Sequence, residues 1–134
     1  MSKSNATETD ILAKIFTATA LPWDAVTDLD IHLHTADPGE AGTSASNEAT
    51  YTGYALVTVS RSGSAWTVTG NTCVNDNLIQ FPQCSGGSNT ITHVSITPSG
   101  STQILYSGAL NASLTVTNLI QPQFAASALS ITED

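Results

Sequence analysis

The 134-residue chain has a formal net charge of −8, yet only 10% of its residues are charged, against a typical ~25%. Three Lys and Arg residues are too few to neutralise phosphates, so the composition disfavours nucleic acid and anionic membranes as partners. The N-terminus is polar, and no apolar run approaches the ~20 residues of a membrane helix. We therefore expect no secretion signal, no membrane span and synthesis in a cytoplasm.

The length predicts one domain, residues 1–134, with an arm and short helix at 1–20 and a β-sandwich at 21–134. The helix is predicted over residues 7–18, where Thr7 and Asp10 resemble a capping box. The apolar side chains that share one face of this helix are Ile11, Leu12, Ile15 and Phe16. This face either covers an open end of the β domain or docks on a partner subunit.

A half-buried strand is predicted at residues 28–34, because apolar and polar residues alternate there. Leu29, Ile31 and Leu33 fall on one face, and Asp28, Asp30, His32 and His34 fall on the other. Imidazoles two residues apart on a strand could share a metal ion, but no further ligand is evident. We therefore favour solvent-facing histidines that pair with neighbouring aspartates.

Residues 35–50 form a predicted loop rich in small residues, with a turn signal at Pro38–Gly39. It is longer than the ~12–15 residues that most loops do not exceed. Ordered loops of this length usually have a function. No Lys–Ser/Thr pair or helix follows Gly39 and Gly42, so a phosphate-binding loop is excluded. The loop is either a contact surface or an inert surface segment, and we expect deletion of Glu40–Ser46 to spare folding yet weaken attachment to a partner.

The remaining strands are shorter. Residues 55–60 and 66–70 are predicted to form a hairpin about a turn at Ser62–Ser64. Further strands are expected at residues 78–82, 90–97, 103–107, 113–118 and 128–132, with a break at 108–112. In 90–97, Ile91, His93 and Ser95 should oppose Thr92, Val94 and Ile96. About seven or eight strands and one helix predict an all-β fold, a β-sandwich of jelly-roll type.

Two cysteines, Cys73 and Cys84, flank the predicted strand at residues 78–82. A cytoplasmic chain favours free thiols, and two cysteines are too few for a structural zinc site unless His93 and another ligand converge. No base lies beside either residue in the sequence, so nothing indicates a catalytic thiolate.

Several segments together resemble small virion proteins of tailed bacteriophages, and the resemblance spans nearly the whole chain. The segments are residues 33–42 (LHTADPGEAG), 47–48, 51–55 (YTGYA), 66–68 and 104–110 (ILYSGAL), with the two termini. Such proteins are described as tail-fibre-like or structural. The resemblance implies a virion component made in the bacterial cytoplasm. It supplies no catalytic residues and no cofactor, so we expect no enzyme.

Within that class, we favour a capsid cement or decoration protein that binds the outer head surface. Its partners would be the major capsid protein and copies of itself on the lattice. A charge of −8 would be repelled by packaged DNA, and the compact chain shows no fibre-like repeats. The candidate capsid-contact residues are Thr7, Glu8, Asp37, Pro38, Gly39, Glu40, Asn47 and Glu48. We expect these polar segments to become ordered on binding.

Two alternatives remain open. The first is a tail-fibre or tail accessory protein involved in host-surface binding, for which Tyr51, Tyr54 and Trp66 are the aromatic residues to examine, although they are expected in the core. The second is a small metal-dependent enzyme that would use Asp30, His32 and His34.

Overall fold

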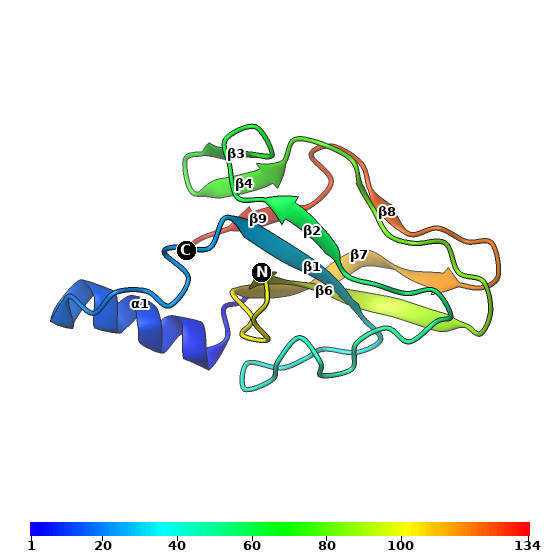
Figure 1. Ribbon diagram of the computed structural model, residues 1–134, viewed down its shortest axis with the longest axis horizontal. Helices are drawn as coiled ribbons and strands as arrows, with labels where there is room; N and C mark the ends of the chain where they lie inside the picture. The colour runs from blue at the N-terminus through cyan, green and yellow to red at the C-terminus, as the bar shows by residue number, and fades with distance from the viewer.

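The computed structural model describes residues 1–134 and contains one helix and nine strands (Figure 1). In chain order these are α1 (Asn5–Thr17), β1 (Asp28–His34), β2 (Val57–Ser60), β3 (Trp66–Thr69), β4 (Thr72–Asn75), β5 (Ile79–Gln80), β6 (Asn89–Pro98), β7 (Tyr106–Val116), β8 (Gln123–Phe124) and β9 (Ser130–Thr132). The expected all-β fold with a short N-terminal helix is confirmed. The helix is neither long nor apolar enough to cross a membrane.

The strands form three antiparallel sheets, with orders β2-β1-β6-β7, β3-β4-β9 and β5-β8. The core lies between the four-stranded sheet and the two smaller ones. Its side chains include Ile31 and Ile96 from the large sheet, and Trp66, Ile79 and Ile131 from the others. This arrangement is a β-sandwich, and its jelly-roll connectivity stays a prediction.

Strand β1 lies inside the large sheet and is buried on both of its faces. Ile31 and Leu33 point into the core, as the alternation predicted. The other face was expected to meet solvent, but there Asp30, His32 and His34 are all buried. That expectation is wrong because segments outside the sheet cover this second face.

The predicted hairpin of residues 55–60 and 66–70 does not form. Strand β2 pairs with β1, whereas β3 pairs with β4 in a different sheet. The turn at Ser62–Ser64 therefore carries the chain from one layer to the other. Burial of the Trp66 ring in the core, with its indole N–H donating to the carbonyl of Ser60 at 3.1 Å, favours this corner over a hairpin.

Two expectations about the long strands also fail. A register shift between Ile91 and His93 interrupts the regular alternation of β6, so Ile91, Val94 and Ile96 are all in the core. The break expected at residues 108–112 does not divide β7 into two strands, but the regular pairing with β6 is interrupted there, since Ala109 pairs with His93 and the next pair joins Leu114 to Ile91. Strands β4 and β8, which were not predicted, contain too few apolar residues to show a pattern.

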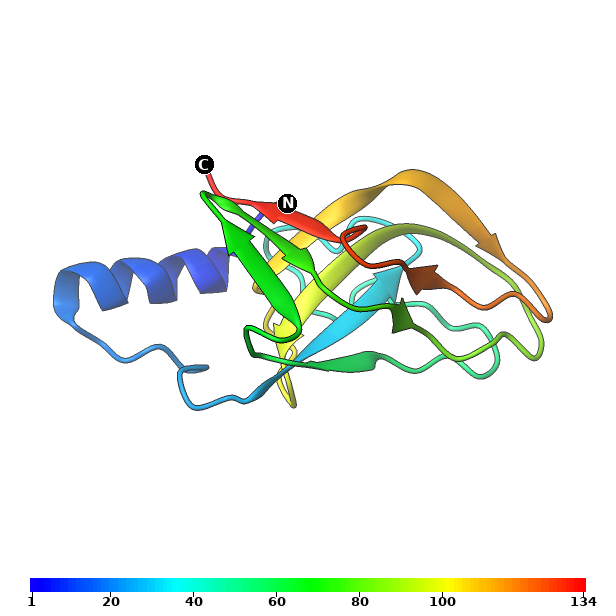
Figure 2. The ribbon, with the colours of Figure 1, turned by 90° about the horizontal axis from the view of Figure 1, so that it is seen from above.

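Helix α1 is attached to the body through its first two turns, the second by a hydrogen bond from the Gln103 side chain to Asp10 at 2.8 Å. The cap is Ser4, not Thr7, and its hydroxyl accepts from the Thr7 backbone N–H. The side-chain hydroxyls of Ser4 and Thr7 both donate to the carbonyl of Ile104, at 2.6 and 2.7 Å. The rest of α1 projects from the sandwich (Figure 2), with Ile15 and Phe16 65% and 78% exposed. The apolar face therefore covers no end of the sandwich, which corrects the first expectation.

The loop of residues 35–50 is held by bonds within the chain. The Thr35 N–H donates to Asn47 O at 2.8 Å, which closes the loop at its base. Its tip is tied to neighbouring segments, since Asn5 N–H donates to Glu40 O and Ser44 N–H donates to Thr102 O. The loop thus has its ordered position without a partner, contrary to the expected ordering on binding.

These bonds change what deletion of Glu40–Ser46 should do. The deletion removes the carbonyl of Ser46, which is a partner of the buried His34, and exposes the polar face of β1. Because a buried group without its partner costs about 1–3 kcal/mol, we expect the free energy of unfolding to fall by at least about that amount. Urea denaturation measures this. The exposed Ala41→Ser substitution is the control, and a deletion variant as stable as that control would contradict the prediction.

Candidate functional site

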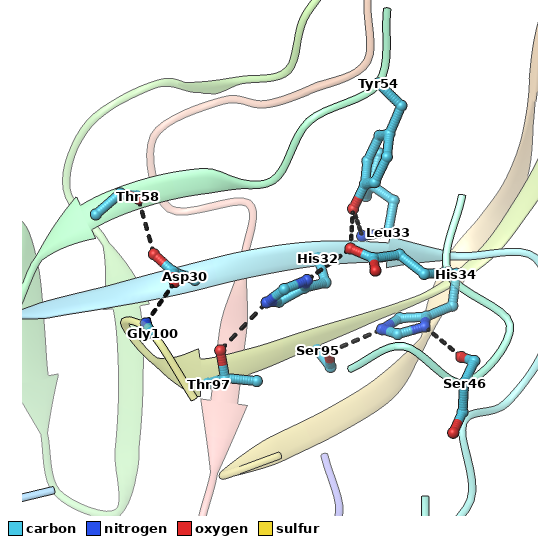
Figure 3. A network of polar contacts seen from close by, with 11 residues as sticks. Asp30, His32, Leu33, His34, Ser46, Tyr54, Thr58, Ser95, Thr97 and Gly100 are labelled. Atoms are coloured by element: carbon cyan, nitrogen blue, oxygen red, sulfur yellow. Dashed lines mark hydrogen bonds and ion pairs between the residues drawn. The ribbon is translucent and has the colours of Figure 1, made fainter. Parts of the chain in front are cut away.

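The covered face of β1 carries neighbouring polar side chains, most of them buried, each bonded to other segments; they are shown in Figure 3, and we call them the polar layer. Its members are Asp30, His32 and His34 from β1, Ser95 and Thr97 from β6, and Glu48 from the covering loop. Pairing of β1 with β6 places His32 opposite Ser95 and Asp30 opposite Thr97. The antiparallel register therefore assembles residues that are more than sixty positions apart in the chain.

His32 joins the loop to the sheet. Its Nδ1–H donates to Glu48 Oε1 at 2.7 Å, and its Nε2 lies 3.2 Å from the hydroxyl of Thr97. Glu48 Oε1 also accepts from the Tyr54 hydroxyl at 3.0 Å, and the same hydroxyl accepts from the Leu33 N–H. Burial raises the pKa of Tyr54, so it stays protonated and able to donate.

His34 is fully buried and has a partner at each ring nitrogen. Nδ1–H donates to Ser46 O at 2.9 Å, and Nε2 lies 2.7 Å from the Ser95 hydroxyl. Burial lowers the pKa of His34 below its ordinary value of 6.5, and this outweighs the opposite effect of the Ser46 hydrogen bond. The neutral ring donates at Nδ1 and accepts from Ser95 at Nε2, so it satisfies both partners.

Asp30 attaches a second covering segment. One carboxylate oxygen accepts from the Thr58 hydroxyl at 2.7 Å, and the other accepts from the Gly100 N–H at 3.2 Å. Gly100 has a φ of +79°, a left-handed conformation that glycine adopts without strain. Asp30 thereby fixes the turn that follows β6.

The hydrogen-bonding groups of the polar layer bond to other segments of the same chain and hold those segments against β1. Every buried side-chain nitrogen and oxygen has a hydrogen-bond partner. The ring centroids of His32 and His34 are 6.5 Å apart, and no three His, Cys, Asp or Glu side chains converge as metal ligands. A metal ion at Asp30, His32 and His34 would have to replace these bonds.

A second feature is a cavity of about 640 Å³ that opens between the layers. Its apolar walls include Trp66, Val68 and Ile96, and its lining also includes Arg61 and Glu133. Both charges have partners. Arg61 donates to Trp23 O at 2.7 Å, while a hydrogen bond from Lys3 lowers the pKa of Glu133. Sequence analysis missed this cavity because its walls come from six separate strands.

The structure separates the candidate contact residues into two groups. Thr7 and Pro38 are buried, and Glu48 belongs to the polar layer. The exposed members are Glu8, Asp37, Gly39, Glu40 and Asn47. The bond from Asn5 N–H to Glu40 O brings the loop beside the start of α1, so some of these residues lie near one another. Their contact with a partner stays a prediction.

The aromatic residues considered for surface binding belong to the core cluster or pack against it, as expected. Tyr51 and Trp66 are buried, and Tyr54 packs edge-on against Tyr51 with ring centroids 5.4 Å apart. Burial raises the pKa of Tyr51 to about 12. Cys73 and Cys84 are free thiols, as predicted, and burial raises the pKa of Cys73.

Comparison with protein families matches nearly the whole chain. A family model described as Podophage GP4 fiber I protein gp80 matches residues 2–132. No curated protein matches the chain. The match covers α1, all nine strands and the polar layer.

The pKa of His34 predicts a loss of stability in mild acid. In the unfolded chain His34 takes up a proton near pH 6.5, whereas the folded form resists protonation. Stability is therefore retained above about pH 6.5 and lost as the pH falls through the lower, folded-state pKa. The slope of the unfolding free energy should steepen by up to about 1.4 kcal/mol per pH unit.

This slope can be measured by urea denaturation between pH 7.5 and about pH 5. His32, Glu48 and His93 also influence the ring, so the His34 part is isolated by comparison with His34→Asn. Asn keeps a donor for Ser46 O but does not titrate. If the variant keeps the slope of the native chain, the assignment to His34 is wrong.

Proposed function

The chain belongs to the podophage GP4 fiber I protein gp80 family, and from this premise we propose that it is a structural subunit of a podophage tail fibre or tail accessory assembly. Membership makes it a phage virion structural protein. The proposal of a tail location is supported by the match to a fibre protein family over residues 2–132. This supports the tail alternative over the capsid cement role, for which the major capsid protein would be the partner.

We assign attachment within the virion to α1. Leu12, Ile15 and Phe16 are more than half exposed on a helix that is bonded to the body through its first two turns. Apolar side chains each gain about 1.5–3 kcal/mol when fully buried, so a neighbouring protein with an apolar groove would gain stability from this face. The proposed occupant of that contact is another protein of the tail, since the chain is a virion component.

The sandwich is the part that would face outward. The polar layer and the bonds of the 35–50 loop hold it in one arrangement without a partner. A rigid body on a projecting helix fits a subunit that extends from the particle. Contact with the host surface would then involve the sandwich, and adsorption measurements with particles that lack the protein test that part separately.

Location and copy number test the tail assignment. We expect quantitative mass spectrometry of purified particles to find few copies, and antibody labelling in electron microscopy to mark the tail. A copy number that matches the capsid subunits, with label over the whole head, would overturn the fibre proposal and support the cement role.

Substitution of the exposed apolar side chains tests the role of α1. The double variant Leu12→Ser, Phe16→Ser should fold with a free energy of unfolding within about 0.5 kcal/mol of the native value, because both side chains are exposed. Its incorporation into particles, measured by mass spectrometry, should fall by at least roughly tenfold. The control is Leu78→Ser, at a position 53% exposed on the sandwich. Normal incorporation of the double variant would contradict the assignment.

A further inference from the structure

Strand β7 forms a free edge of the large sheet. It pairs with β6 along one side, and Figure 2 shows it along one border of the molecule. Its other side pairs only at Ser107, which exchanges two 2.8 Å backbone bonds with Ser2. From Gly108 to Val116, no backbone group bonds to any segment other than β6. A row of amide and carbonyl groups is therefore open to a further strand.

This edge lacks most of the features that usually protect a sheet edge from pairing. Proteins protect such edges with charged residues, proline, very short strands or β-bulges. Strand β7 has 11 residues, none of them charged or proline, and its one irregularity is the register shift of its pairing with β6 between Ala109 and Leu114. By contrast, the opposite edge strand β2 has only four residues.

An apolar groove runs beside the free edge. A cavity of about 340 Å³ is lined by Leu110 and Leu114 of β7 and by Phe124 and Leu129 on the facing layer. Leu114 is 37% exposed although it points to the inner side of the sheet, opposite Ile91. The core is thus incomplete at this border, and an added strand with apolar residues at alternate positions would close it.

The charge distribution indicates which strand fits. The chain carries −8 in total, yet no Asp, Glu, Lys or Arg lies between Asp76 and Glu133. Two copies of so acidic a chain repel each other least where neither carries charge. Strand β7 lies within this neutral part, and it carries its own two leucines, Leu110 and Leu114. A second copy therefore offers both the neutral edge and the apolar side chains that the groove lacks.

We propose that β7 pairs antiparallel with β7 of a second copy about a two-fold axis, which joins two four-stranded sheets into one. The contact is isologous, with the same edge used on both copies. Leu110 and Leu114 of each copy then cover the groove of the other. This interface goes beyond the tail assignment, because it concerns the chain itself wherever the virion holds it.

Sedimentation equilibrium of the purified chain tests the pairing. The native chain should be a dimer that dissociates on dilution. The variant Asn111→Lys, Ser113→Lys places like charges on both edges, and its dimer should dissociate at a concentration at least roughly tenfold higher. Both substitutions lower the net negative charge, so a general charge effect would strengthen association instead.

The matched control is Thr67→Lys, Thr69→Lys on β3. Those positions are also exposed, two residues apart and on an edge strand, with the same change in charge. We expect this control to dimerise like the native chain. A native chain that stays monomeric at all concentrations, or a β7 variant that associates like the control, would overturn the proposal.

Hydrogen exchange locates the interface. Amides of residues 109–115 should gain protection in the dimer and lose it on dilution. A dimer that protects α1 and leaves these amides unchanged would overturn strand pairing. A monomer located on the tail would defeat this interface only, whereas a β7 dimer found all over the head would defeat the tail assignment only.

Discussion

The fold depends on the burial of two imidazoles and a carboxylate on the outer face of β1. His32, His34 and Asp30 lose their water there, so each needs a partner from a segment that covers the sheet. Glu48 and Ser46 supply partners from one loop, and Gly100 supplies another from the turn after β6. The polar layer therefore decides where these covering segments lie, and it does so with directional bonds that an apolar surface would not impose.

The same covering segments hold the start of α1. Ser4 and Thr7 donate to Ile104 in the segment after β6, and Asn5 donates to Glu40 in the loop. The rest of the helix leaves the body, which gives a rigid sandwich with one projecting arm. The two surfaces left without partners, the apolar face of α1 and the free edge of β7, are of different chemical kinds. We propose the first as the contact to a neighbouring virion protein and the second as the contact to another copy of the chain.

Local patterns predicted the elements better than their pairing. The strand at residues 28–34 and the inward positions of Leu129 and Ile131 follow from alternation alone. The hairpin at Ser62–Ser64 was wrong because a turn signal does not say whether the chain stays in one sheet. The register shift after Ile91 was also hidden, since only the pairing with β7 requires it.

The sequence by itself determined a β-rich, acidic virion protein with an amphipathic helix, because composition, alternation and the quoted segments are local properties. It also identified residues 28–34 as the strand that carries the candidate site. Only the tertiary structure decided that His32 and His34 are buried and paired, since their partners Thr97 and Ser95 lie more than sixty residues away in the chain. The burial of His34, which lowers its pKa, depends on the segments that pack over β1. The sequence of β1 alone does not show which segments these are.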